Sequence, residues 1–537
     1  MNREDLILLG RRGLDAIFSN KRIALGVFVV LLLLIFLYPK WSGRRSSQYA
    51  SSSDSSKFCL ESALKRLKES EVARFDAALD YPYDSSSAIP FVGNGYFGFS
   101  VWPGASGADR VFVQSDNSAG GGFGTLSLSH PLSLTVDFRI ADLPFAQAYY
   151  TSFIHGTVTE FKSFSIEGEC VTIESQYYTH RRYPSVLVQD ILIHNTHVSE
   201  IEVVGSRNQA SWRDITTVRI PVSASGQEYQ LMTDSIPVPS DPNKKVLITS
   251  VALPSVPSTI KVSSKQTNRF QLLTGLDKSE PASEDVYSNH RNALEKQLTK
   301  TLSAVKGKDI AKLYQEHSSV WEKLTESGLS ISHSMAPDVL NGDIINRTVY
   351  YVLSNTPSAL AEADLAPSAV EELTTALYSM DRCYISHNTL LYPSKLWNSV
   401  KRVEDIPKLA YLWKLTLEKK GGCRTLLKAG ALGVSQAMLL SFGALKFTHH
   451  HLEFGMRPKD LHRNYHFHKI GYGNGSFIDI AVEVSPENKA ELYVWLTDAS
   501  SGGPPQDFFA CDAGCLDEPH QLKHDMKQAI SSQIDRS

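Results

Sequence analysis

The stretch that decides the fold is "AGALGVSQAMLLSFGALKF", residues 429–447. It carries almost no charge and is nearly long enough to cross a bilayer, so it is either a membrane span or a buried helix. It contains Gln436 and many small residues, lacks aromatic flanks, and runs into strand-like sequence. We therefore predict a buried helix whose small residues let neighbouring backbones approach closely, and which leads into a final β domain.

The sequence on either side changes period twice. Residues 58–283 begin with a helical pattern and then show short alternating runs between Gly, Pro, Asn and Ser clusters, which predicts an antiparallel β-sandwich domain. Residues 284–445 place apolar side chains at helical intervals and predict a helical linker and a reduced helical domain. Residues 446–537 return to strand patterns and predict a small C-terminal β domain and tail. The expected class is α+β.

A membrane anchor is predicted at residues 23–38, "IALGVFVVLLLLIFLY", which are uninterrupted and flanked by basic residues. Residues 1–22 would then be a cytosolic tail, and the Ser-rich residues 39–57 a stem. A cleaved signal peptide is the alternative, but no A-x-A-like site follows. The expected location is a single-pass membrane protein of the endoplasmic reticulum, Golgi or cell surface, with its body lumenal or extracellular.

All the cysteines follow this segment, and their even number suits disulfides in an oxidising lumen. Six unpaired buried thiols are the alternative. Two sequons, at Asn346 and Asn474, are candidate glycosylation sites. The candidate disulfide cysteines are Cys59, Cys170, Cys383, Cys423, Cys511 and Cys515.

Motifs for other functions are weak. A net charge of −3 gives no basic footprint for nucleic acid, so no nucleic-acid partner is expected. "GNGYFG", residues 93–98, is followed by a strand and a turn, which favours a hairpin over a dinucleotide site. His466 and His468 would share one strand face, a geometry zinc could use, but no carboxylate or thiol stands at a recognisable spacing. We predict no metal and no cofactor.

No catalytic residues are predicted either. Glycosidases hold two carboxylates across a cleft, and the acidic residues of the helical region are scattered outside any sharp motif. The sequence contains no nucleophile elbow, P-loop or H-E-x-x-H. The scattered candidates are Glu371, Glu372, Asp381, Glu404 and Asp405.

Three segments, "YLWKLTLEKKGGCRTLLKAGALGVSQAMLLSFGALKF", "NRTVYYVLSNTP" and "FACDAGCLDEP", closely resemble an uncharacterised, KIAA-series family of animal single-pass membrane proteins. The resemblance covers about residues 59–522. It implies that all the cysteines have family counterparts and favours disulfides and a glycan at Asn346. Of the histidines, only His451, His462 and His468 match. Family members carry a C-terminal span, whereas this sequence ends in "KQAISSQIDRS". Either residues 23–38 are its only anchor, or the sequence is truncated before a C-terminal span.

A more distant resemblance, through "GNGYFG", "EHSSVWEKL" and the stretch quoted first, is to maltose-phosphorylase/trehalase-like glycoside hydrolases. It implies a β super-sandwich, a helical linker and a C-terminal β domain. The sequence between residues 358 and 430 is too short for the family's helical barrel, and its general-acid segment has no match.

The function expected from these features is non-catalytic: a membrane glycoprotein with a degenerate glycosidase-like fold that acts by binding or scaffolding. Its partners would be the membrane, through one span, and a carbohydrate or protein ligand. Two alternatives stay open. One is a carbohydrate-active enzyme with an unrecognised active site, and the other is a secretory-pathway cargo or assembly factor that binds protein only.

Overall fold

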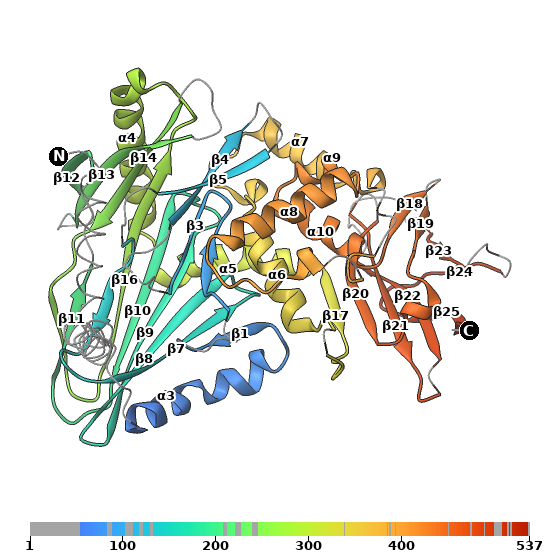
Figure 1. Ribbon diagram of the computed structural model, residues 1–537, viewed down its shortest axis with the longest axis horizontal. Coiled ribbons are helices and arrows are strands. Elements are labelled where there is room, and N and C mark those ends of the chain that lie inside the picture. Colours follow the sequence, from blue (N-terminus) through green and yellow to red (C-terminus); the bar gives the residue numbers. More distant parts are fainter. Residues whose placement is uncertain are drawn as a thin grey trace, which may run out of the picture.

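The computed structural model shows three regions along its longest axis (Figure 1). A large β-sheet with its covering layers lies at one end, helices lie in the middle, and a smaller β-sheet holds the C-terminal end. The structure describes residues 54–82, 88–102, 111–117, 122–128, 133–207, 212–220, 227–238, 245–337, 339–383, 385, 388–391, 394–448, 451–472, 475–487, 489–498, 507–512, 515 and 518–534.

The large sheet has nine strands, and each neighbouring pair is antiparallel. Successive side chains of a strand point to opposite faces, and both Val188 and Ile191 of β10 are buried, so the sheet is covered on both faces. In spatial order its strands are β1 (Ala77–Asp80), β7 (Phe145–Ser152), β8 (Thr157–Ile166), β9 (Glu169–Thr179), β10 (Val186–Asn195), β16 (Thr267–Lys278), β14 (Val246–Pro254), β13 (Gln227–Pro237) and β12 (Asp214–Ile220).

Two smaller antiparallel sheets cover one of these faces. Phe99 of the four-stranded sheet shares a buried cluster with Tyr177 and Leu187, and Val203 of the three-stranded sheet shares another with Ile191. This is the sandwich that the alternating sequence predicts. The covering strands are β2 (Phe91–Gly93), β3 (Phe97–Ser100), β4 (Val111–Asn117) and β5 (Gly122–Ser127) in one sheet, and β15 (Thr259–Val262), β11 (Ile201–Ser206) and β6 (Asp137–Arg139) in the other.

Helices cover the opposite face. Leu64 of α3 packs in one cluster with Phe161, and Leu298 and Leu302 of α4 pack in another with Val188. The remaining helices form the middle region, which confirms the α+β class with a large antiparallel sheet and a helical middle. The helices are α3 (Asp54–Leu67), α4 (Tyr287–Lys306), α5 (Ile310–Thr325), α6 (Gly342–Ser354), α7 (Pro367–Leu377), α8 (Asp405–Lys419), α9 (Arg424–Leu427) and α10 (Ala431–Phe442).

Helix α10 lies within the stretch quoted first, and every residue of the helix except Leu432 is buried. A helix that is apolar all round has no solvent face, so it must be enclosed by other elements. Its small residues permit this: a Cβ added at Gly433 would lie 1.9 Å from the Leu426 carbonyl oxygen of α9. The prediction of a buried helix is confirmed.

The C-terminal sheet follows α10 and contains one strand from outside its own region. Strand β17 (Gly328–Ile331) lies between α5 and α6 in the chain but pairs with β20 at the sheet edge. The helical reading of residues 284–445 missed this short strand. The five strands are β17, β20 (Tyr465–Gly471), β21 (Phe477–Val484), β22 (Ala490–Asp498) and β25 (Gln528–Ile534), beside the short pairs β18 (Lys446–Thr448) with β19 (His451–Glu453) and β23 (Phe509–Ala510) with β24 (His520–Gln521).

The predicted anchor at residues 23–38 lies outside the described residues. Within the part of the chain that the structure describes, no helix combines the length and the apolar character needed to span a membrane.

Candidate functional site

A cavity of about 360 Å³ lies where α5, α6 and α10 meet β17. Its volume is within the range of small-molecule sites, which are mostly apolar with a few polar groups. Its lining combines aromatic rings with polar side chains that include Asn346, Ser435 and His468. The cavity therefore joins the sandwich, the helical middle and the C-terminal sheet.

The aromatic wall of the cavity is fixed by packing. The rings of Trp321 (α5) and Tyr350 (α6) are stacked with centroids 5.2 Å apart, and Phe153 lies 5.2 Å from Tyr350. The Arg181 guanidinium lies over the indole at 4.4 Å. Gly156, with φ 67°, lets the backbone pass against the indole, because a Cβ there would lie 1.9 Å from Trp321 Nε1.

Each acidic side chain on the cavity lining has a basic or imidazole partner. A general acid at neutral pH needs an apolar, unpaired setting, and none of these carboxylates has one. The scattered acids named from the sequence do not line this cavity. The pairs are Asp76 with Arg74 (2.8 Å), Glu322 with His155 (3.7 Å) and Glu326 with Lys469 (3.0 Å).

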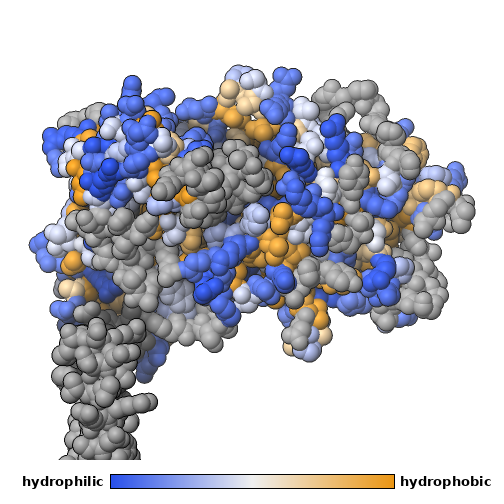
Figure 2. All heavy atoms as spheres, turned by 45° about the horizontal axis from the view of Figure 1, so that its top comes forward, coloured by the Kyte–Doolittle hydropathy of each residue, from blue (hydrophilic) through white to orange (hydrophobic). Residues whose placement is uncertain are grey.

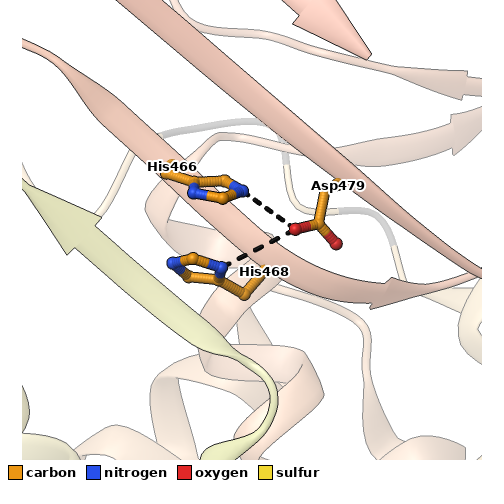
Figure 3. A group of neighbouring side chains, drawn as sticks. All are labelled: His466, His468 and Asp479. Atoms are coloured by element: carbon orange, nitrogen blue, oxygen red, sulfur yellow. Dashed lines mark hydrogen bonds and ion pairs between the residues drawn. The ribbon is translucent and has the colours of Figure 1, made fainter. Parts of the chain in front are cut away.

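A polar cluster of His466, His468 and Asp479 borders the cavity (Figure 3). The two histidines share one face of β20, as predicted, and Asp479 comes from the adjacent strand β21. His466 Nε2 lies 2.8 Å and His468 Nδ1 lies 3.6 Å from the same oxygen, Asp479 Oδ2. Both imidazoles therefore converge on one carboxylate oxygen.

A β-bulge creates this convergence. Phe467 pairs with Ile480 and Ile470 with Ile478, so two residues of β20, His468 and Lys469, stand opposite Asp479 alone. Lys469 adopts the left-handed backbone conformation (φ 48°), which is unusual for a residue with a side chain. The surrounding structure must hold it there.

Gln436 of α10 holds the bulge. Its Nε2 donates to the Lys469 carbonyl at 3.0 Å and to Ser327 Oγ at 2.6 Å, and its Oε1 accepts from the Gly471 N–H at 3.1 Å. The one amide in the fold-deciding helix thus braces the strand that carries both histidines.

Burial opposes ionisation of Asp479, but hydrogen bonds from His466, His468, Thr497 and the Lys469 N–H outweigh it and hold the pKa of the carboxyl below its usual range. The Asp479 side chain is only 5% exposed, whereas His466 and His468 are 33% and 34% exposed. The cluster is therefore a buried anion with two accessible imidazoles above it.

Asp479 is the residue that sequence reasoning missed. Its signal was an acidic side chain inside the apolar run "FIDIAV", but the cross-strand register that places it beside the histidines cannot be read from spacing. His449, His450 and Asn474 lie outside the described residues. Asn346 lies on α6, half-buried, with its Nδ2 donating to the Phe75 carbonyl at 3.0 Å.

The structure brings the cysteines together in pairs. Their Cα atoms are 5.5, 4.4 and 5.1 Å apart, within or at the edge of the usual range for disulfides. The pairs are Cys59 with Cys170, Cys383 with Cys423, and Cys511 with Cys515.

Fold and site together define a mixed α+β protein with a cavity where a sandwich, helices and a C-terminal sheet meet. The chain belongs to the family described as "Uncharacterized conserved protein (DUF2152)", whose model matches residues 10–535. It is 31% identical over 366 residues to the "Uncharacterized protein KIAA2013 homolog" of Xenopus laevis, and 31% identical over 368 residues to that of Xenopus tropicalis. Each match covers 67% of this chain and 58% of the relative, so the chain spans less than two thirds of these relatives' length.

Among solved structures, the chain is similar to a "Putative kojibiose phosphorylase from human microbiome". The TM-score is 0.36 and the identity 10%, over 52% of this chain and 41% of the other. A likeness at this level is too weak to assign the two proteins to one fold.

Proposed function

We propose that this protein acts without catalysis, by binding a carbohydrate ligand in the cavity between α5, α6 and α10. The observation that carries the proposal is a cavity of small-molecule size whose lining combines aromatic side chains with half-buried polar groups. Aromatic faces pack against the apolar faces of sugar rings, and a few fixed polar groups then orient the hydroxyls. Asn346 and His468 stand at that lining.

The paired carboxylates support binding over turnover. Glycoside hydrolysis requires one carboxyl that donates a proton and a second that acts as base or nucleophile. Around this cavity each acidic side chain is engaged by Arg74, His155 or Lys469. A bound sugar would therefore meet carboxylates that already have partners, two of them in ion pairs, rather than an acid ready to protonate a leaving group.

Binding of protein alone is less well supported. Large contiguous apolar patches on a surface mark sites of protein interaction. On the face in Figure 2, hydrophobic groups among the described residues are interrupted by hydrophilic side chains. The described residues of that face therefore do not form the kind of apolar patch that marks a docking surface.

The proposed setting is a lumenal or extracellular body on a single membrane span. The apolar residues 23–38 and the pairing of cysteines, which persists in oxidising compartments, support it. Protease protection of the chain in intact microsomes tests this. We expect residues beyond 58 to be protected until detergent is added.

The binding test uses the purified full chain on a glycan array, followed by calorimetry with the glycans that bind. Val349→Phe fills the cavity from a half-buried position on α6, so we expect it to abolish binding while the fold is kept. Ile344→Phe is the matched control, because it adds the same ring to the same helix at an exposed position outside the cavity.

Three outcomes separate the candidate functions. Binding that is lost only in Val349→Phe, with no products formed, supports the proposal. Release of sugar from a bound glycan would establish an enzyme. A folded chain that binds no glycan would refute the proposal and favour the cargo or assembly role, which crosslinking in microsomes would then identify.

A further inference from the structure

We propose that His466, His468 and Asp479 form a binding site for one divalent transition-metal ion, with zinc as the ion that the side chains fit best. Two imidazoles and a carboxylate are a common protein ligand set for zinc sites that keep an open fourth position. The site shares His468 with the cavity lining, but its test measures bound metal and not sugar, so the two proposals can fail separately.

The spacing of the ligand atoms fits tetrahedral coordination. With metal–ligand bonds of about 2.0–2.1 Å, the edge of a coordination tetrahedron is about 3.3 Å. The two distances to Asp479 Oδ2, 2.8 Å from His466 Nε2 and 3.6 Å from His468 Nδ1, lie on either side of that value. All three ligand atoms lie within 4.8 Å of one another, so rotamer adjustments alone would centre an ion between them.

The carboxylate is oriented as a metal ligand would be. Asp479 Oδ1 accepts hydrogen bonds from the Lys469 N–H at 2.9 Å and from the Thr497 hydroxyl. Those contacts occupy one oxygen and leave Oδ2 toward the imidazoles (Figure 3). Fixing a ligating carboxylate through its second oxygen is a recurrent feature of metal sites.

The His468 imidazole is also oriented, through its second ring nitrogen. His468 Nε2 lies 2.8 Å from Ser330 Oγ of β17. When Nε2 carries the proton and donates it to this hydroxyl, the Nδ1 lone pair is directed at the space shared with Asp479. An outer partner that fixes the tautomer in this way is typical of metal-ligating histidines.

Charge and access agree with a cation at this position. The Asp479 carboxylate is 5% exposed, and a buried anion needs compensating positive charge. The two imidazole centroids are only 3.6 Å apart, so a single ion held between the ligands compensates the anion without placing charge on either ring. One third of each imidazole is exposed, which gives an ion a path to the site.

The simpler explanation is a metal-free hydrogen-bond network that ties β20 to β21. Both explanations predict that the histidines touch Asp479, but only the metal site predicts a one-to-one ion stoichiometry and a coordination spectrum. Zinc competition with a chromophoric chelator and cobalt absorption in the visible range measure these two properties.

The experiment uses the full chain after treatment with a chelator, and the variants His466→Ala, His468→Ala and Ser330→Ala. We expect one zinc per chain, cobalt bands of tetrahedral intensity, and loss of both in each histidine variant. Ser330→Ala removes only the outer partner, so we expect a 10–100-fold weaker affinity. His451→Ala, at an exposed histidine of β19, is the matched control and should bind like the parent.

Circular dichroism and thermal unfolding without metal show whether each variant is folded. The histidines are partly exposed, so their removal should leave the fold intact. A folded chain that takes up no zinc or cobalt in the chelator assay would overturn the proposal. Equal binding by the parent and both histidine variants would also overturn it, since the ion would then lie elsewhere.

Discussion

Replacing Gln436 with leucine tests whether one amide of the buried helix α10 braces the bulge of β20. The substitution keeps the volume but removes the bonds to Ser327 Oγ, the Lys469 carbonyl and the Gly471 N–H. The Lys469 carbonyl keeps a second donor, Ser327 Oγ at 2.9 Å, so the Gly471 N–H is the group left unsatisfied. A buried orphaned donor costs about 1–3 kcal/mol, and we take about 2 kcal/mol as the expected loss.

Hydrogen exchange measures this loss where it arises. A local cost of about 2 kcal/mol corresponds to roughly 30-fold faster exchange of the Gly471 amide, since each 1.4 kcal/mol is about tenfold. The assay is exchange followed by mass spectrometry on a peptide covering residues 465–472. Ser441→Ala is the control, because its hydroxyl is also buried in α10 but bonds to Thr389 at 2.8 Å, away from the bulge.

Unchanged exchange in this peptide would contradict the reasoning, because the bulge would then be held by the sheet alone. An equal increase in the Ser441→Ala control would contradict it too, since the effect would belong to the helix as a whole and not to its amide.

Three further predictions concern the core. Gly156→Ala should lower the melting temperature far more than Gly168→Ala. Both glycines have positive φ, but only the Cβ at position 156 would clash with the Trp321 ring, and such overpacking costs about 1–3 kcal/mol. Burial lowers the pKa of His180 to about 4, from an unfolded value near 6.5, so the unfolded state binds more protons between these values. The free energy of unfolding should therefore be highest above pH 6.5 and fall by up to about 3 kcal/mol as the pH falls toward 4. Urea unfolding at pH 7 and at pH 4.5 measures this, and an unchanged free energy would contradict it. Peptide mapping without reductant should recover Cys59 linked to Cys170, and recovery of free thiols would refute this. The link closes a loop with a sequence separation of 111 residues, for which the chain-entropy model gives a stabilisation of about 4–5 kcal/mol.

The layers of the fold were predictable because they depend on local pattern. Alternation of apolar side chains specified the strands, and the switch to helical spacing specified the middle region. Gln436 and the interspersed glycines were enough to separate a buried helix from a membrane span. What these residues contact could not be predicted, since the partners of Gln436 are Ser327 and the backbone of Lys469 and Gly471, far from it in the sequence.

Only the two histidines of the polar cluster could be placed together from the sequence. The i, i+2 spacing of His466 and His468 places them on one strand face in any regular strand. Asp479 reaches them through the pairing of β20 with β21 and a bulge, and neither register nor bulge position is encoded in spacing alone. The cavity could not be predicted either, because its lining residues are spread along the sequence from Asp76 to His468.

The burial of α10 determines when, during synthesis of the chain, the core around it can form. A ribosome releases the sandwich first and residues 431–442 late, yet those residues share one buried cluster with Trp321, Tyr350 and Phe467. A nascent chain halted before α10 would present the uncovered sides of α5 and α6 to its surroundings. The interior can therefore close only after α10 has been synthesised, and the chain without α10 is the form that folding chaperones should bind.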